Sequence, residues 1–225
     1  MRPLVLGVAT VIVVAAVGAA FILSSSPEDK YALTVAYSEK MNYEPLMVAE
    51  DRGFFTDAGL NVTPAIVTGG IQAAEALLAA SADVAVMGDA PAVQLIPRLI
   101  SKGIGAKIIA RITGAEGMHR IIADSSIVEP SDLEGKTVGM QQSSSSQGAF
   151  LQWCAANGVN TANVTFRWLN PANLAQAMAT KQIAAMIGSE PWAINTENLC
   201  GASVHELGNS SGLGSTFPIV IVASE

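Results

Sequence analysis

The sequence predicts an α/β fold with two similar lobes, each a mainly parallel sheet flanked by helices. Short apolar strands alternate along the chain with helices of about ten residues, which is typical of βαβ units. In addition, residues 76–89 can be laid over residues 177–190 at a constant offset of 101 (177 minus 76). Each copy reads as a helix, a buried strand and then a carboxylate, Asp89 or Glu190. The repeat indicates two lobes of the same build.

We expect strands and helices in alternation from residue 33 onward. The first strand alternates apolar and polar side chains, and the third ends at a Gly-Asp-Ala-Pro turn before a helix. Asn170 and Pro171 form an N-cap and first-turn pair that begins a later helix. The expected strands are residues 33–37, 62–67, 84–87, 108–112, 137–140, 164–169, 183–187 and 217–222. The expected helices are residues 43–52, 71–80, 90–99 and 145–157, and one after Pro171.

The first 30 residues form a separate N-terminal unit. Residues 4–23 contain no charge and no proline, and about 20 such residues span a hydrocarbon core as a helix. Arg2 precedes them, which favours a cytoplasmic N-terminus. We predict a membrane anchor followed by a polar linker, with a cleaved signal peptide as the open alternative. The rest of the chain would then be extracytoplasmic, either membrane-anchored or secreted.

The net charge argues against nucleic acid as a partner, and the cysteine and histidine spacing argues against a zinc site. The net charge is −7, and no cluster of Lys and Arg occurs, so nucleic acid is not an expected partner. Cys154 and Cys200 would lie where disulfides persist, and both a disulfide and free thiols, which we favour, remain open. Together with His119 and His205 they give no zinc-binding spacing. We expect no metal and no cofactor.

Four consecutive serines, residues 143–146, precede the helix expected at 145–157. The first backbone N–H groups of a helix have no partner within the helix, so they can hold an anionic or polar group. An N-cap alone needs only one serine. We therefore predict that these serines bind a ligand, with simple capping as the alternative.

The candidate ligand residues follow the carboxyl ends of the predicted strands. In open parallel sheets, ligands bind outside those ends. Gly69-Gly70, Asp89, Glu190 and the serines would all lie there. Two such edges facing each other would form a cleft.

Several short motifs resemble one known family. They are Pro45-Leu46 to Ala49, Arg52-Gly53-Phe54-Phe55, Gly59-Leu60-Asn61-Val62, Gly69-Gly70, Ala82-Asp83-Val84-Ala85, Asp132 to Gly139, and Glu190-Pro191-Trp192. In this order and spacing they are similar to the extracytoplasmic solute-binding proteins of ABC importers for nitrate, sulfonates, taurine and thiamine pyrimidines. The resemblance covers residues 33–222.

The resemblance implies a type II periplasmic-binding-protein fold that closes over a small ligand without chemistry. It implies a monomer that delivers the ligand to a permease with its ATPase subunit. Lobe 1 would be residues 31–114, lobe 2 residues 115–216, and residues 217–225 the start of a crossover back to lobe 1, whose return segment is missing. The implied ligand contacts are Ser38, Tyr43, Gly69, Gly70, Asp89, Ser143, Ser144, Ser145, Glu190 and Trp192.

The predicted cleft loops carry neutral donors and two carboxylates, whereas Arg111, Arg120 and His119 lie at or beyond the expected hinge. A bare anion usually needs a nearby cation. An aminosulfonate or an aminopyrimidine therefore fits Asp89 and Glu190 better. Helix-dipole partners are the alternative for these carboxylates.

Two aromatic residues also belong to the predicted cleft. Trp192 is either a core residue or a ring-stacking platform. Tyr43 has polar neighbours and is expected to be exposed at the cleft.

Two other classes of function are compatible with this fold. The same fold serves enzymes of pyrimidine and menaquinone biosynthesis, so fold alone does not exclude catalysis. However, the sequence contains no Ser/His/Asp order, no GxSxG and no paired-histidine motif. A membrane-tethered sensor domain is a further alternative.

Overall fold

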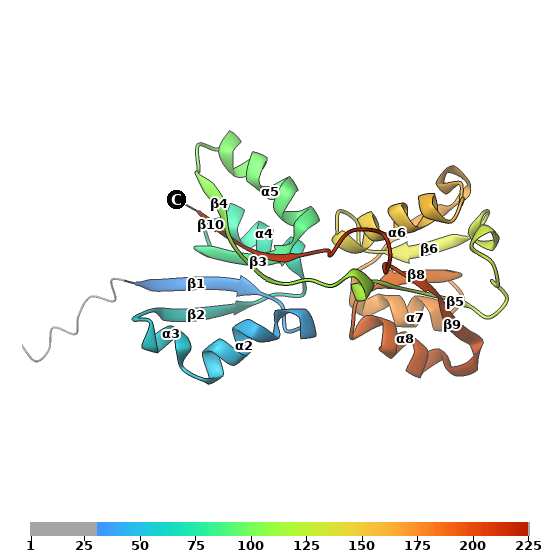
Figure 1. The fold of residues 1–225 in the computed structure, drawn as a ribbon, viewed down its shortest axis with the longest axis horizontal. Coiled ribbons are helices and arrows are strands. Elements are labelled where there is room, and N and C mark those ends of the chain that lie inside the picture. The colour runs from blue at the N-terminus through green and yellow to red at the C-terminus, as the bar shows by residue number, and fades with distance from the viewer. Residues whose placement is uncertain (1–30, 225) are drawn as a thin grey trace, which may run out of the picture.

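The computed structural model describes residues 31–224, which form two five-stranded sheets lying side by side (Figure 1). The membrane segment predicted at residues 4–23 lies outside this range. Within the range, no helix combines the length and the apolar composition needed to cross a membrane.

The first sheet has the strand order β2-β1-β3-β10-β4. Its strands are β1 (Ala32–Tyr37), β2 (Asn61–Ile66), β3 (Val84–Gly88), β4 (Ala106–Thr113) and β10 (Ile219–Ser224). The second sheet has the order β7-β6-β8-β5-β9. Its strands are β5 (Arg120–Asp124), β6 (Thr137–Met140), β7 (Thr165–Trp168), β8 (Ala185–Gly188) and β9 (Val204–Asn209).

Helices cover both faces of each sheet (Figure 1). Around the first sheet are α2 (Glu44–Asp51), α3 (Phe54–Asp57), α4 (Gly70–Leu78) and α5 (Asp89–Ser101). Around the second are α6 (Ser145–Ala156), α7 (Leu174–Ala179) and α8 (Trp192–Cys200). Period-2 alternation explains the arrangement: neighbouring residues of one strand point to opposite faces. Thus Val35 packs in one buried cluster, and Ala36 packs in another on the opposite face.

Both sheets are mixed but mainly parallel, as the sequence predicts: in each, four strands run in one direction and one strand runs against them. In the first sheet β1 pairs in parallel with β2 and β3, but β10 runs antiparallel to β3 and β4. The second sheet repeats this, with β5 antiparallel to β8 and β9. The cause is an exchange of strands: β10 comes from the end of the chain, after the second sheet is complete.

The two sheets therefore share one topology. β3 lies between β1 and β10, and β8 lies in the equivalent place between β6 and β5. These are the strands that the offset of 101 residues superimposes. Asp89 and Glu190 follow them at the carboxyl ends.

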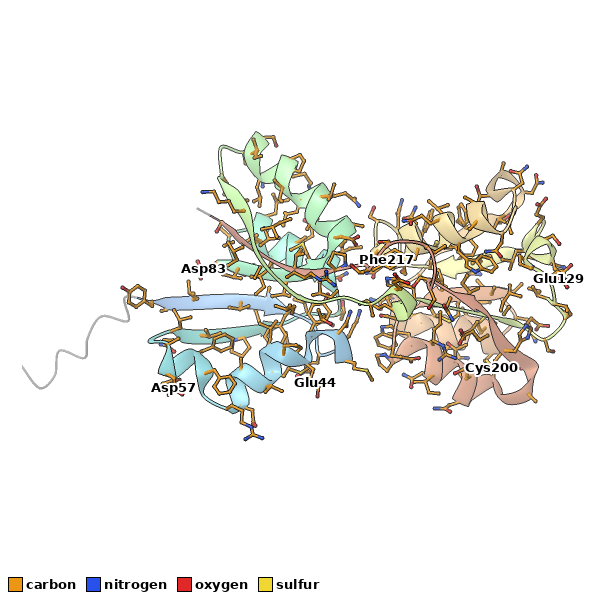
Figure 2. The ribbon with its side chains drawn as sticks, viewed as in Figure 1. Glu44, Asp57, Asp83, Glu129, Cys200 and Phe217 are labelled. Atoms are coloured by element: carbon orange, nitrogen blue, oxygen red, sulfur yellow. The ribbon has the colours of Figure 1, made fainter. Side chains whose placement is uncertain are left out.

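Two connections, residues 114–119 and 210–218, cross between the sheets and contact each other. The Ser210 N–H donates to the His119 carbonyl at 2.9 Å, and the His119 N–H donates to Ser210 Oγ at 3.1 Å. Phe217, labelled in Figure 2, packs edge-on against the His119 ring with centroids 5.1 Å apart. The crossing segments thus bring His119 to the junction of the sheets.

Candidate functional site

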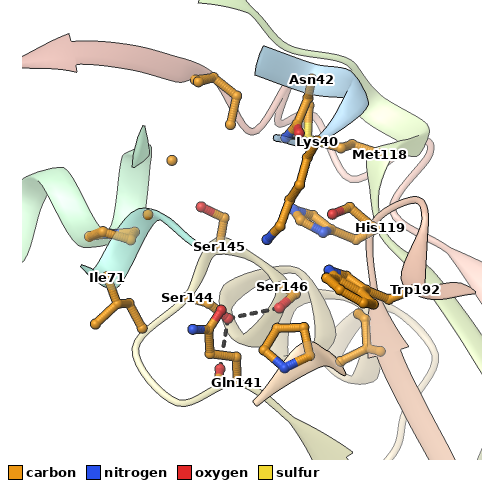
Figure 3. Close-up of a pocket in the computed structure, with 18 of the residues that line it drawn as sticks. Lys40, Asn42, Ile71, Met118, His119, Gln141, Ser144, Ser145, Ser146 and Trp192 are labelled. Carbon is orange, nitrogen blue, oxygen red and sulfur yellow. Dashed lines mark hydrogen bonds between the residues drawn. The ribbon is translucent and has the colours of Figure 1, made fainter. Parts of the chain in front are cut away.

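A cavity of about 60 Å³ lies between the two sheets and is lined from both (Figure 3). The first sheet's loops contribute Lys40, Asn42 and Gly70, and the crossing segment contributes His119. From the second sheet's loops come Ser144, Ser145, Ser146 and Trp192. The site therefore lies at the carboxyl ends of β1, β3, β6 and β8, as an open sheet places a ligand.

Lys40 supplies a cation to this cavity. It precedes the short helical turn η1 (Met41–Tyr43), and its ammonium lies 5.8 Å from the centre of the Trp192 ring. Within residues 31–224, no carboxylate forms an ion pair with it. Burial lowers the pKa of the Lys40 ammonium to about 8. A partly buried cation without a counter-charge favours an anion beside it.

The four serines at residues 143–146 have different roles. Ser144 caps α6, since its Oγ accepts from the Gln147 N–H at 3.3 Å and donates to the Gln141 carbonyl at 2.7 Å. Ser146 is buried and shares a 2.7 Å hydrogen bond with Ser144 (Figure 3). Both line the cavity, so capping and a place at the site coexist here. Ser143 does not line the cavity.

Ser145 makes a contact across the cleft. Its Oγ donates to Asp89 Oδ1 at 2.5 Å, joining the N-termini of α6 and α5. Asp89 also accepts from the Ala90 N–H at 2.8 Å. Next to them, the Gln94 side chain donates to the Ser143 carbonyl at 3.2 Å. The cavity is thus closed over by bonds between the lobes.

Neither predicted carboxylate lines the cavity. Asp89 is engaged by Ser145, and Glu190 pairs with Arg120 at 2.8 Å and accepts from the Ile194 N–H at 3.0 Å. The expectation that these carboxylates hold a ligand amine therefore finds no support in their placement. The expectation that the cleft lacks a cation is wrong, because Lys40 lies in it.

Arg120 joins three elements behind the cavity. Its guanidinium pairs with Glu190 at 2.8 Å, Glu197 at 2.5 Å and Glu206 at 2.6 Å. Glu190 lies just before α8, Glu197 lies within it and Glu206 lies in β9. The network fixes the start of α8, where Trp192 faces the cavity.

The remaining predicted residues are near the site to different degrees. Tyr43 and Gly70 line the cavity, but Ser38 and Gly69 do not. A Cβ on Gly69 would lie 3.5 Å from Lys40 Nζ, so Gly69 borders the site. Tyr43 was expected to be exposed, yet it is buried against the core of the first sheet. It packs in the buried cluster that contains Leu46 of α2.

Three residues of the site were not predicted from the sequence: Lys40, Asn42 and His119. The His119 side chain is only 5% exposed, and burial lowers the pKa of its imidazole to about 4, so it is neutral at neutral pH. Lys40 and Asn42 share the loop that holds Ser38 and Tyr43, which was the available signal. For His119 the sequence offered no such signal, because the neighbouring strand β5 was not predicted.

Residues 40–207, well over half of the chain, match the family model described as NMT1/THI5 like. The chain belongs to this family. No curated protein matches the chain in a sequence comparison.

Solved structures of similar fold include binding proteins for sulfonates and for nitrate. The alkanesulfonate-binding protein SsuA from Xanthomonas axonopodis pv. citri, bound to MOPS, has a TM-score of 0.72 and 24% identity, covering 85% of this chain and 65% of that chain. The periplasmic aliphatic sulphonate binding protein SsuA from Escherichia coli has a TM-score of 0.71 and 20% identity, covering 88% and 65%. The periplasmic nitrate-binding protein NrtA from Synechocystis PCC 6803 has a TM-score of 0.67 and 15% identity, covering 85% and 55%.

These similarities show the periplasmic-binding-protein fold. The chain spans less than two thirds of the length of each of these three structures. The family predicted from the sequence motifs is confirmed.

Proposed function

We propose that this chain is the solute-binding component of an ABC import system and that it captures a small oxyanion, of the sulfonate or nitrate type, between its lobes. It would act outside the cytoplasm and pass the solute to a permease. Binding without catalysis is the proposed activity.

One observation carries the proposal: the Lys40 ammonium faces the inter-lobe cavity without a carboxylate partner among the described residues. Opposite it, Ser144 and Ser146 lie at the N-terminus of α6, where backbone N–H groups favour negative charge. A cation on one lobe and a helix N-terminus on the other suit an anion that holds the lobes together.

The solved structures of similar fold support the same class of solute. Two bind sulfonates, one of them is bound to MOPS, and another binds nitrate. All of these ligands or ligand groups are oxyanions. The cavity of about 60 Å³ favours a ligand of few atoms.

A thermal-shift panel tests the proposal. We would compare methanesulfonate, ethanesulfonate, nitrate, taurine and an aminopyrimidine, with Lys40→Met as the matched control. At a hundred times its Kd a ligand stabilises the fold by about 2.7 kcal/mol, which corresponds to roughly 5–10 °C in a chain of this size. We expect such a shift for at least one sulfonate or nitrate, and its loss in K40M. A shift produced by the aminopyrimidine alone, or retained in K40M, would contradict the proposal.

A further inference from the structure

The cavity contains four buried polar atoms that have no hydrogen-bond partner within the described part of the chain. They are Asn42 Oδ1, Trp192 Nε1 and both ring nitrogens of His119. Only one other side-chain atom of residues 31–224 is in this state, Gln72 Oε1, and Gln72 does not line the cavity. Buried polar groups in folded proteins are nearly always paired. Their concentration here indicates that a ligand completes them.

These atoms differ in what they offer. The indole N–H of Trp192 is a donor only, and a neutral imidazole has one donor and one acceptor nitrogen. In Asn42 the amide nitrogen donates to Met118 Sδ at 3.6 Å, which leaves Oδ1 as an acceptor. Beyond the Lys40 ammonium, the cavity thus presents two donors and two acceptors.

A bare oxyanion satisfies only the donors, because a sulfonate or nitrate carries no hydrogen to give. With such a ligand, Asn42 Oδ1 and one nitrogen of His119 would stay buried and unpaired, which is unfavourable. The ligand therefore needs a hydrogen-bond donor besides its anionic group.

The donor is expected to be uncharged. An ammonium would lie in the same small cavity as the Lys40 ammonium, and no carboxylate of the described residues lines that cavity. Asp89 and Glu190 are already bonded to Ser145 and Arg120. A hydroxyl is the simplest neutral donor that also accepts.

From the hydrogen-bonding capacity of these atoms we infer that the ligand is a small organic anion bearing a hydroxyl, with Lys40 at its anionic end and Asn42 and His119 at its hydroxyl. The single hydroxyl hydrogen goes to Asn42 Oδ1, the hydroxyl oxygen accepts from the imidazole N–H of His119, and a water pairs the second imidazole nitrogen. The inference rests on the proposed function and specifies its substrate class. The size of the cavity limits the ligand to a chain of very few carbons.

Two sulfonates with the same number of non-hydrogen atoms test the inference. 2-Hydroxyethanesulfonate carries the hydroxyl, and propane-1-sulfonate has a methyl group in its place. By isothermal titration calorimetry on the full chain, we expect the hydroxylated compound to bind at least about tenfold more tightly. Taurine, with an ammonium there, should bind more weakly than the hydroxylated compound.

Variants assign the preference to named residues. His119→Phe and Asn42→Leu should each reduce the ratio of the two Kd values to below about threefold by weakening the hydroxylated ligand. His119→Gln keeps a donor and an acceptor and should retain most of the preference. If His119→Phe fails to fold, N42L carries the same test. A preference that survives in the folded variants would overturn the inference.

The outcomes separate the inference from the proposed function. Equal binding of both sulfonates, weakened equally by Lys40→Met, would leave the anion site in place and overturn the hydroxyl assignment, with water then pairing the acceptors. Absence of binding by any anion, hydroxylated or not, would overturn the proposed function itself.

Discussion

Lys40 determines the charge preference of the cavity. Its ammonium lies against the face of Trp192, where a cation–π contact offsets a part of the lost hydration. No carboxylate of residues 31–224 forms an ion pair with the ammonium, and burial lowers its pKa to about 8. An oxyanion would restore the lost stabilisation. The charge that faces the cavity thus comes from Lys40, after β1, and not from Asp89 or Glu190 at the ends of β3 and β8.

His119 leads to a prediction about stability and pH. Burial lowers the pKa of its imidazole to about 4. The charge of Asp89 acts to raise this pKa, whereas the charge of Lys40 acts to lower it. The unfolded chain takes up the proton near pH 6.5, so stability is highest above that pH and falls as the pH drops toward 4. The loss attributable to His119 approaches roughly 3 kcal/mol at pH 4.

Urea unfolding of the wild type and His119→Gln between pH 7 and pH 4.5 checks this, because glutamine does not titrate. The difference in unfolding free energy between the two proteins should shift in favour of the variant as the pH falls. Parallel curves over the whole range would show that His119 is not buried as a neutral group.

At the scale of elements, closure depends on α5 and α6. Ser145 of α6 bonds to Asp89 of α5, and the backbone of Gly88 lies directly against the Ser145 hydroxyl. A Cβ on Gly88 would overlap Ser145 Oγ, and Gly88 has an ordinary φ of −69°, so alanine there adds bulk without backbone strain. This site is therefore a steric probe of lobe closure.

We predict that Gly88→Ala weakens anion binding by at least about tenfold, because Ser145 must leave Asp89 and a hydrogen bond to a charged group is lost. In a Ser145→Ala background the overlap disappears, so Gly88→Ala should add little further loss. Calorimetry on the wild type, both single variants and the double variant measures this coupling. Additive losses would mean that the two residues do not meet in the closed form.

The sequence predicted the elements more reliably than their pairing. All eight expected strands are present, and the strand at Thr137–Met140 has the expected bounds. β5 was not predicted, although Ile121 and Ile122 are fully buried, because its apolar run is only three residues long. β9 was missed because it is a largely polar edge strand. Edge position, which is a tertiary property, allows such a composition.

At the scale of the whole molecule, each sheet has one antiparallel strand, β10 in the first and β5 in the second. Each of these strands follows a connection that crosses from the other sheet. Local patterns show which segments are strands, but the exchange of β5 and β10 depends on where the chain crosses. The repeat at residues 76–89 and 177–190 is a local pattern, and it predicted the ends of β3 and β8 correctly. The role of Lys40 is not local, so the sequence did not predict it. Lys40 acquires its role only when the lobes meet.

We propose that an anion binds between Lys40 on one lobe and the N-terminus of α6 on the other. A lysine with a pKa of about 8 must be protonated to bind an anion, so affinity should be nearly constant below pH 8 and fall by up to about tenfold per pH unit above it. Lys40→Arg keeps its charge throughout this range and should bind with little pH dependence.

Calorimetric titration of the preferred small sulfonate against wild type, Lys40→Arg and Lys40→Met from pH 7 to pH 10 tests the claim most directly. We predict weakening above pH 8 in the wild type, a nearly flat profile in K40R and weak binding at every pH in K40M. Equal affinity of wild type and K40M at pH 7 would contradict the account.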